Sequence, residues 1–405
     1  MAEIAPFKGI FYNTKINLKD VVTPPYDVIS PSERERFYQK SPYNIIRIIL
    51  GKEKNRYIQA RRCFIAWQRE RILCQDKNEA IYLYRQRFRI KGGRKERFGF
   101  LALLKLENLK TGSIIPHERT FLQYRKDRYQ LLARCLANFS PIFFLYRDPE
   151  KRIETELKKE TKKIPFLEFK DEEKVTHQIW RLTKKNRIRR LISLMKGGRI
   201  YIADGHHRYL SALLFHQRNQ KRSSSFTLAY FTNISSPSLS ILPVHRLIIK
   251  KRNFGEIREQ IKKFFAIKKA SKEMMFKQLK YHSHRHSFGF YLGEGKFFLL
   301  ILKDEKVMEN FVSKEKATRY LDVVIAHKLL IEHLFKSNEI FYFKDEELLI
   351  KRVNQEKGKS VAVFLNPVKS AELIDVCGRR KILPPKSTYF YPKIPAGLLI
   401  YKLDP

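Results

Sequence analysis

The sequence predicts an α+β protein with a mixed α/β architecture, and three observations support this expectation. Runs rich in β-branched and aromatic residues recur along the chain, and segments with apolar residues at helical spacing separate them. The 405 residues are enough for two or three domains, each with its own core. A hydrophobic content of 43% and an aromatic content of 13% are typical of a globular chain and exclude a disordered one.

Residues 1–249 are expected to form an N-terminal α/β region. Paired prolines at positions 24 and 25 forbid a helix there, and Ser32-Glu33-Arg34-Glu35 has the pattern of a capping box that starts a short helix. Gly92-Gly93 is the expected turn of a hairpin. The expected strands are 43–50, 80–90, 97–106, 138–146, 199–202, 226–232 and 242–247. The expected helices are 56–73, 126–136 and 210–216.

Residues 250–405 are expected to form a C-terminal α+β region, with a boundary near Lys250. Apolar residues recur at helical spacing from Leu321 to Leu329, which predicts one buried helix face. The aromatic-rich segment 384–393 is expected to be an ordered loop that folds back on the N-terminal region. The other expected elements are helices at 255–265 and 271–281, two strands within 287–302 and a strand at 360–365.

The cysteine pattern predicts a reducing compartment. Four cysteines are scattered along the chain without a CxxC pair, so neither a disulfide framework nor a zinc site is indicated. The first residues lack the apolar stretch of a signal peptide, and no later segment has the length of a membrane span. The sequence therefore predicts a cytoplasmic protein without a membrane partner.

The net charge of +42 is compatible with polyanionic partners. The basic residues are spread along nearly the whole chain, whereas a dedicated nucleic-acid arm or helix would concentrate them. A host whose proteins are generally basic would produce the same pattern. Nucleic acid is therefore weighed as a partner but not favoured, and an anionic small molecule such as a nucleotide is equally attracted by such a field.

The densest group of reactive side chains is Asp204-Gly205-His206-His207-Arg208. It stands between a β-rich run and a helical run, so its backbone N–H groups face outward at a helix start, where anions bind. Arg208 can bind a phosphate or carboxylate through two parallel hydrogen bonds, and the histidines titrate near neutral pH. Asp204 could cap the helix or hold Mg²⁺. A turn with a helix cap and packed histidines is the alternative interpretation.

Further candidates lie elsewhere in the chain. His117-Glu118 pairs an imidazole with a carboxylate, which suits general-base chemistry, although an exposed pair after a strand is the plainer interpretation. Lys386-Ser387-Thr388 offers an ammonium group and two hydroxyls to a phosphate. His282, His284 and His286 would share one face of a strand, but a basic loop or strand is favoured over a metal site. The sequence contains no P-loop, Rossmann or α/β-hydrolase motif.

Six segments occur in an order that resembles one bacterial and archaeal family, domain of unknown function 1015. The segments are Pro24-Pro25-Tyr26-Asp27-Val28, Pro116-His117-Glu118-Arg119-Thr120, Asn138-Phe139-Ser140-Pro141-Ile142, Ala203 to Tyr209, Leu242-Pro243-Val244-His245-Arg246 and Pro384 to Phe390. The resemblance spans nearly the whole chain. It implies little settled biochemistry.

The Asp204 to Arg208 segment is also similar to the signature of the ParB/sulfiredoxin-like superfamily. That resemblance implies a ParB/sulfiredoxin-like core whose turn holds nucleotide phosphates. The superfamily includes kinases of free serine, in which an upstream glutamate acts as the base; Glu118, with His117 beside it, is the position that corresponds here. The interval between the two motifs is longer than in those kinases. After the signature, Leu210-Ser211 replaces the family's usual glutamate-threonine, which puts activity in question.

These observations predict a nucleotide-dependent phosphotransferase, kinase-like, that acts on a small hydroxylated metabolite. Residues 204–208 would bind the phosphates of ATP, ADP or CTP with Mg²⁺, and Glu118 would take the proton of the attacking hydroxyl. Tyr26, Asp27 and the segment 386–388 would complete the pocket. The alternatives are a non-catalytic nucleotide- or DNA-binding regulator of the ParB-like type and a small-anion-binding protein. The sequence does not define the acceptor, the phosphate donor or the oligomeric state.

Overall fold

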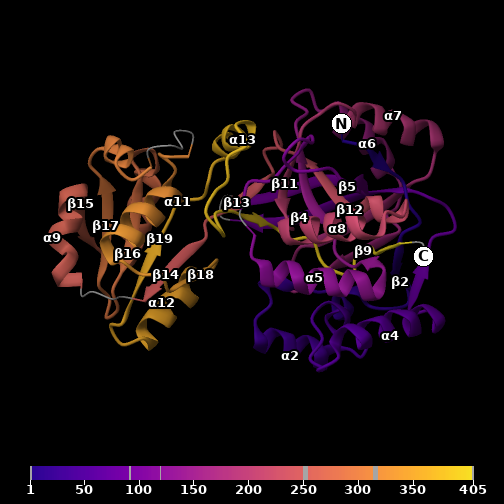
Figure 1. Cartoon of the computed structure of the whole chain (residues 1–405), viewed down its shortest axis with the longest axis horizontal. Helices are drawn as coiled ribbons and strands as arrows, with labels where there is room; N and C mark the ends of the chain where they lie inside the picture. Colours follow the sequence, from indigo (N-terminus) through magenta and orange to yellow (C-terminus); the bar gives the residue numbers. More distant parts are fainter. Residues whose placement is uncertain (1, 91–92, 119, 250–253, 313–317, 404–405) are drawn as a thin grey trace. The chain divides into compact units, whose positions relative to one another are not determined.

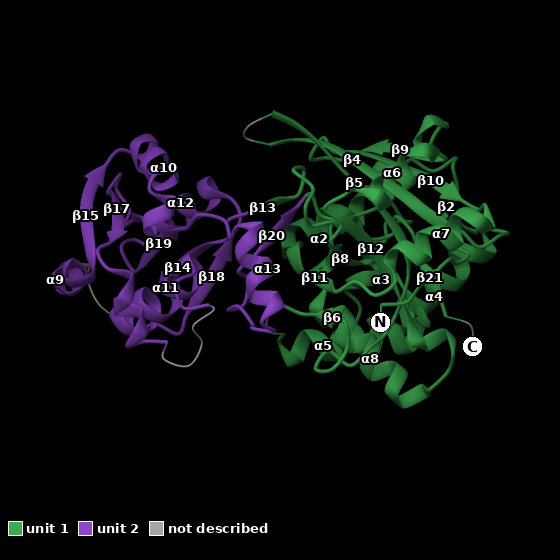
Figure 2. Cartoon of the chain, turned by 90° about the horizontal axis from the view of Figure 1, so that it is seen from above, with its two compact units in different colours: residues 1–116, 120–240, 392–405 green, residues 117–119, 241–391 purple. Residues whose placement is uncertain are grey.

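The computed structural model describes residues 2–90, 93–118, 120–249, 254–312 and 318–403. The chain divides into two compact units, coloured separately in Figure 2. Unit 1 comprises residues 1–116, 120–240 and 392–405, and unit 2 comprises residues 117–119 and 241–391. Both units mix helices and strands (Figure 1), which confirms the α+β class. The expected boundary near Lys250 and the glycine turn at 92–93 fall partly or wholly outside the described residues, and both stay predictions.

Unit 1 is built on a nine-stranded mixed sheet. Its strands are β1 (Ile4–Ala5), β4 (Ile81–Ile90), β5 (Gly93–Lys105), β6 (Ile114–Ile115), β8 (Ile142–Tyr146), β9 (Leu167–Lys170), β10 (Thr176–Leu182), β11 (Ile200–Asp204) and β12 (Phe226–Asn233). The order is β6-β11-β8-β12-β5-β4-β10-β9, with β1 also paired to β5. Only β6–β11 and β8–β12 are parallel pairs among these strands. The long β4–β5 hairpin matches the sequence expectation.

One face of this sheet is apolar and carries four helices. In β5, Phe98, Phe100, Ala102 and Leu104 point to this face and belong to one buried core with residues of the helices. Such alternation follows from the two-residue period of a strand. The helices are α5 (Leu122–Cys135), α6 (Arg152–Lys158), α7 (Lys185–Met195) and α8 (His206–Asn219). They bury their apolar faces there, so the start of α8 is held on a rigid support.

The opposite face of the sheet carries polar and aromatic side chains. Arg97 is fully buried and donates to Gln86 Oε1 on the neighbouring strand. It also donates to the carbonyl of Pro392, while Gln86 donates to the carbonyl of Lys393 over 3.0 Å. A buried guanidinium is costly unless its donors are satisfied, so this pair fixes the backbone of the returning C-terminal segment.

The remaining elements of unit 1 are mostly short. They are β2 (Ile10–Tyr12), β3 (Leu73–Gln75), β7 (Ala137–Asn138), β21 (Tyr401–Lys402), α1 (Leu18–Val21), α2 (Pro31–Lys40), α3 (Ile46–Ile49), α4 (Arg56–Arg69), η1 (Tyr26–Val28), η2 (Lys159–Lys162) and η3 (Ser223–Ser225). None of the helices in the described part of the chain has both the length and the apolar character needed to cross a membrane.

Two expectations near the N-terminus are wrong. Residues 43–50 form no strand; Asn44 accepts from the N–H of Ile46, and α3 begins at Ile46. The expectation failed because a short continuous apolar run does not distinguish a strand from a buried helical turn. The capping box uses Ser30 and Glu33, two residues earlier than expected, with Pro31 as the first helical residue.

Unit 2 contains a six-stranded antiparallel sheet in the order β15-β17-β16-β19-β14-β18. Its strands are β14 (His245–Ile249), β15 (Phe265–Ala270), β16 (Ser287–Tyr291), β17 (Phe297–Leu302), β18 (Ile340–Phe343) and β19 (Ser360–Phe364). The other elements are β13 (Ser240–Leu242), α9 (Phe254–Phe264), α10 (Lys272–Tyr281), η4 (Ser283–Arg285), η5 (Glu305–Glu309), α11 (Asp322–Ile325), the π-helical segment η6 (Ala326–Phe335), α12 (Glu346–Gln355), α13 (Ser370–Gly378) and β20 (Tyr389–Tyr391). The expected loop at 384–393 thus includes a short strand.

The three alternating histidines do not share a strand but lie in the connection between α10 and β16, in keeping with the basic loop that was one of the two favoured interpretations. His282 ends α10, His284 lies in η4, and His286 has a φ of 49° just before β16. His286 Nδ1 lies 2.8 Å from Asp322 Oδ1, and its Nε2 lies 3.1 Å from Glu305 Oε2. Burial alone lowers the pKa of His286, but the hydrogen bonds and charges of these two carboxylates outweigh it and raise the pKa.

Replacement of Gly99 by alanine is predicted to destabilise unit 1 by about 3 kcal/mol, because its Cβ would lie 2.0 Å from the backbone carbonyl oxygen of Phe231. The measurement is urea unfolding followed by tryptophan fluorescence, which reports unit 1 because both tryptophans, Trp67 and Trp180, lie in it. Gly198→Ala is the matched control, since its Cβ meets nothing closer than 3.8 Å. Equal stability of the two variants would contradict the close approach.

His286→Asn is predicted to lower the free energy of unfolding by about 1 kcal/mol at pH 5.5 and by much less at pH 9. The sign follows from the raised pKa of His286 in the folded protein. The stabilisation that His286 contributes is complete below its pKa in the unfolded chain, about 6.5, and is lost as the pH rises through its pKa in the folded protein. Denaturant unfolding followed by circular dichroism at both pH values measures the effect. His284→Asn is the control. A loss of stability in His286→Asn that does not change with pH would contradict the proposed interaction of His286 with Asp322 and Glu305.

Candidate functional site

The turn between β11 and α8 is shaped by a bulge and a glycine. The pairing of β11 with β8 shifts register between Ile202 and Asp204, which re-aims the end of the strand. Gly205 then takes a φ of 95° as the N-cap of α8. A Cβ at this position would lie 2.9 Å from the Arg208 guanidinium. The glycine is therefore required both by the backbone conformation and by the approach of Arg208 to the turn.

Asp204 is bonded to two cations. Arg208 Nη2 donates to Asp204 Oδ2 over 2.9 Å, and Lys393 Nζ donates to Asp204 Oδ1 over 3.0 Å. The exposed fractions of these three side chains are 17%, 12% and 11% for Asp204, Arg208 and Lys393. One carboxylate between two cations leaves a net charge of +1 in a largely dry environment, where electrostatic attraction to an anion is strong.

Lys393 reaches this turn from a distant part of the sequence. Its backbone carbonyl accepts from Gln86, and the preceding carbonyl accepts from buried Arg97. The ammonium group is thus positioned by the polar face of the sheet and not by neighbours in the sequence. No local motif or spacing signals such a residue, so the sequence alone does not predict its role.

The two histidines of the turn differ in their surroundings. His206 is buried at the first position of α8. His207 is half-buried, and its Nε2 accepts from the backbone N–H of Phe121 over 2.9 Å. Because an N–H can only donate, Nε2 carries the lone pair and the proton of the neutral ring sits on Nδ1. The ring of Phe121 stacks on His207, so this histidine also fixes the segment before α5.

Ser211, one turn further along α8, takes part in packing. Its hydroxyl lies 2.8 Å from the carbonyl of His207 and 2.9 Å from the carbonyl of Arg125 in α5. The serine at this departure from the family pattern therefore connects two helices beside the turn.

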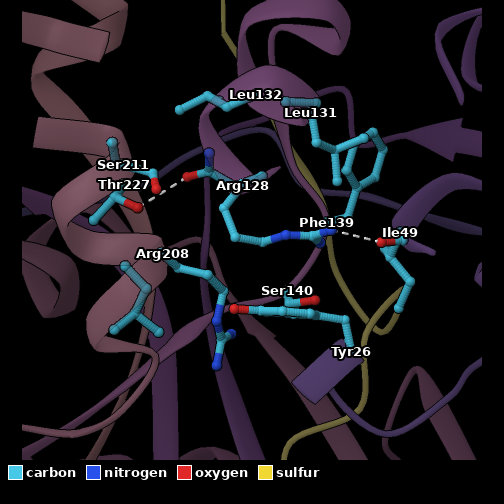
Figure 3. Close-up of a pocket in the computed structure, with 14 residues that line it drawn as sticks. Tyr26, Ile49, Arg128, Leu131, Leu132, Phe139, Ser140, Arg208, Ser211 and Thr227 are labelled. Atoms are coloured by element: carbon cyan, nitrogen blue, oxygen red, sulfur yellow. Dashed lines mark hydrogen bonds between the residues drawn. The ribbon is translucent and has the colours of Figure 1, made fainter. Parts of the chain in front are cut away.

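Arg208 also lines a cavity within unit 1 (Figure 3). Tyr26 of η1 and Ser140, which lies just before β8, line the same cavity, and the Tyr26 hydroxyl points toward the Arg208 guanidinium. Arg208 Nη1 donates to the carbonyl of Pro141. Arg128 lies over the Tyr26 ring at 3.9 Å. Three of the six segments quoted for the family resemblance thus converge around Arg208.

The other three segments converge within unit 2. His117 is buried, and its Nε2 lies 2.9 Å from Thr388 Oγ1. Glu118 pairs in a bridge with Leu383, just before the 384–390 segment. Arg246 of β14 donates to the carbonyls of Val244 and Lys386. The His117-Glu118 pair, the His245-Arg246 pair and segment 386–388 therefore form one cluster.

Arg246 is the dominant charge of this cluster. It is fully buried, and burial lowers its pKa to about 10, opposed by the charges of Tyr342 and Glu118. Its guanidinium carbon lies 5.5 Å from the centre of the Tyr342 ring. The charge of Glu118 acts on this buried cation, so the two groups belong to one electrostatic cluster.

The structure thus sorts the expected site residues into two groups. Tyr26, Asp27 and residues 204–208 lie in unit 1, whereas His117, Glu118 and residues 386–388 lie in unit 2. Asp27 follows Tyr26 in η1, and the Ser387 hydroxyl donates to the Pro384 carbonyl. The sequence patterns predicted no role for Lys393, Arg246, Ser140 or Arg128. Ser140 and Arg246 stand inside segments that resemble the family, so a signal for them was present.

Asp204 does not fit a magnesium site held by the protein itself. Both of its oxygens are bonded to cations, and within the described residues no group of three histidine, cysteine, aspartate or glutamate side chains gathers to hold a metal. Mg²⁺ prefers several oxygen ligands without competing cations.

Comparison with known families places the chain in one of them. The sequence model of the family described as "Protein of unknown function (DUF1015)" matches residues 4–324. The chain belongs to this family. The match includes the segments around Tyr26, Glu118, Ser140, Arg208 and Arg246. Segment 386–388 and Lys393 of this DUF1015 chain lie beyond it. No curated protein matches the sequence.

Several solved structures are similar to this DUF1015 chain at a low level. A mutant of free serine kinase in complex with ADP is 14% identical, with 72% of this chain and 89% of that chain covered and a TM-score of 0.36. SbnI with a C-terminal truncation from Staphylococcus aureus is 11% identical, with 72% and 84% covered and a TM-score of 0.36. A conserved hypothetical protein from Pyrococcus furiosus is 16% identical, with 70% and 90% covered and a TM-score of 0.33. TM-scores of this size carry no functional argument.

Gly205→Ala is predicted to destabilise unit 1 by about 2–3 kcal/mol, and Gly197→Ala by about 1 kcal/mol. Both glycines have positive φ, 95° and 86°, but only the Cβ at position 205 meets another group, the Arg208 guanidinium at 2.9 Å. The difference between the two variants isolates that contact from the backbone cost. Tryptophan-monitored urea unfolding measures both values, and an equal loss would show that Arg208 does not pack against the turn.

Proposed function

We propose that this protein is a nucleotide-dependent phosphotransferase that acts on a small hydroxylated metabolite. The observation that carries the proposal is the arrangement at the start of α8, where Arg208 and Lys393 share Asp204 beside Gly205. A helix N-terminus next to two cations and one carboxylate attracts and orients phosphate oxygens. Phosphoryl transfer depends mainly on such positioning and charge neutralisation.

In the proposed reaction, the hydroxyl oxygen of the acceptor forms a bond to the terminal phosphorus of the nucleotide. The bond from that phosphorus to the leaving phosphate oxygen breaks, and a carboxylate base takes the hydroxyl proton. The family resemblance assigns this role to Glu118, which lies in unit 2. Arg208, His206 and His207, with the backbone N–H groups at Gly205, would hold the phosphates. Mg²⁺ enters this proposal as part of the ATP, ADP or CTP complex that is bound as substrate, because Asp204 already serves two cations.

Glu118 is proposed as the base because it is the carboxylate whose charge acts on buried Arg246. Buried Arg246 supplies positive charge, and the bridge to Leu383 fixes the backbone of residue 118. His117 beside it is anchored on Thr388, so the preceding side chain is held as well. General-base catalysis by such a group contributes about 10²- to 10⁴-fold in rate.

A nucleotide- or DNA-binding regulator of the ParB-like type is the second candidate. The observation in its favour is the net charge of +42, which promotes binding to a phosphate backbone. This candidate uses the same phosphate-binding group, which we call the phosphate cradle: Arg208, His206, His207 and the backbone N–H groups at Gly205. It needs no base. It therefore differs from the phosphotransferase in its prediction for Glu118.

The test is a thermal-shift series with ATP, ADP, CTP and GTP in the presence of Mg²⁺, followed by a transfer assay with hydroxylated acceptors. At least one nucleotide is expected to raise the melting temperature. Arg208→Gln is expected to abolish the shift, whereas Arg218→Gln, an exposed arginine in the last turn of the same helix, is expected to retain it. Glu118→Gln is expected to keep the shift and to reduce transfer at least 100-fold.

The outcomes separate the candidates. No shift with any nucleotide, or an equal shift in Arg208→Gln, would contradict the proposed cradle. Nucleotide binding together with salt-dependent DNA binding, and without transfer to any acceptor, would favour the regulator. Transfer that is unaffected by Glu118→Gln would remove Glu118 from the mechanism while leaving the cradle in place.

A further inference from the structure

We propose that the cavity between Tyr26, Ser140 and Arg208 in unit 1 is a binding site for a small oxyanion, distinct from the nucleotide itself. The cavity is lined by residues of η1, α3, α5, the β7–β8 segment, α8 and β12 (Figure 3). Part of its lining is apolar and includes side chains such as Leu131 and Ile142. Polar groups stand on the remaining walls, which is the usual composition of a small-molecule site.

The charge around the cavity favours an anion. On one side, Asp204 is shared by Arg208 and Lys393. On the other, Asp127 is shared by Arg128 and Arg56 in the same manner. Each trio contains two cations and one carboxylate and so carries a net charge of +1. Arg208 and Arg128, one from each trio, line the cavity. The Asp27 carboxylate, whose charge acts on Tyr26, offsets only part of the positive charge, so the surroundings still favour an anion.

Arg208, which lines the cavity, also has a donor that the protein leaves unused. Arg208 donates through Nη1 to Pro141 and through Nη2 to Asp204, but its Nε is buried and has no hydrogen-bond partner among the described residues. A buried N–H of a charged group without a partner is costly, so the charge of Arg208 is incompletely satisfied by the protein itself.

Tyr26 provides a second donor. Its hydroxyl points toward the Arg208 guanidinium (Figure 3), and its ring is held in place by Arg128, 3.9 Å above it. Burial, followed by the charge of Asp27, raises the pKa of Tyr26, so the phenol stays protonated and can donate. Ser140 adds a hydroxyl on the same wall. The positive charge of Arg208 with two hydroxyls from separate elements suits the several oxygens of a phosphate or carboxylate.

The size of the cavity limits the ligand. Its volume is about 50 Å³, room for a few water molecules or one oxyanion group. Sites that enclose whole drug-sized ligands measure about 300–1,000 Å³, so a nucleotide does not fit inside. The ligand is therefore a free inorganic oxyanion or the carboxylate or phosphate end of a small metabolite. This inference shares Arg208 with the proposed phosphate cradle but does not require phosphotransferase activity.

The test is isothermal titration of the full chain with phosphate, sulfate or acetate at constant ionic strength, with chloride as the reference. At least one oxyanion is expected to bind in the millimolar range or tighter. Tyr26→Phe is expected to weaken that binding about tenfold, since one hydrogen bond to a charged ligand is lost. Tyr43→Phe, another tyrosine of unit 1 that does not line the cavity, is the matched control and is expected to bind as the parent does. Preference for acetate over phosphate would identify a carboxylate end, and the reverse a phosphate.

The failures are distinguishable. No oxyanion binding, or equal affinity in Tyr26→Phe and the parent, would overturn this inference while leaving a nucleotide shift intact. Oxyanion binding that depends on Tyr26, without any nucleotide shift, would support the cavity and contradict the proposed function. A melting curve of Tyr26→Phe without ligand verifies that the variant is folded.

Discussion

The interaction on which the site depends is the sharing of Asp204 between Arg208 and Lys393. It closes the turn at Gly205 from within the helix and, at the same time, ties residue 393 to residue 204. A pair of exposed charges would contribute little, but these three side chains are each more than four-fifths buried, so screening by solvent is weak. The arrangement holds a net positive charge at a helix start without help from a ligand.

Buried guanidinium groups position the surrounding segments in both units. Arg97 holds the carbonyl of Pro392 in unit 1, and Arg246 holds the carbonyls of Val244 and Lys386 in unit 2. Each is fully buried, and burial lowers the pKa of each. Because removal of carbonyl partners would leave a buried charge unsatisfied, the segments they hold have few alternative conformations.

The sequence predicted the parts of the structure that depend on local patterns. Long alternating runs such as 80–90 gave the correct strands, and the turn at Gly205 was correctly expected between a strand and a helix. The short apolar run at 43–50 was ambiguous because a buried helical turn has the same composition as a strand. Lys393 was not identified, since its contact with Asp204 spans 189 residues and only the sheet brings the two together.

The most direct test of this account is a double-mutant cycle between Asp204 and Lys393. The free energy of unfolding of unit 1 is measured by tryptophan fluorescence for Asp204→Asn, Lys393→Met, the double variant and the parent. The account predicts a coupling energy of about 1–3 kcal/mol, as expected for a largely buried charge pair that is hydrogen-bonded. A coupling energy indistinguishable from zero would contradict it, because Asp204 would then not be shared between the two cations.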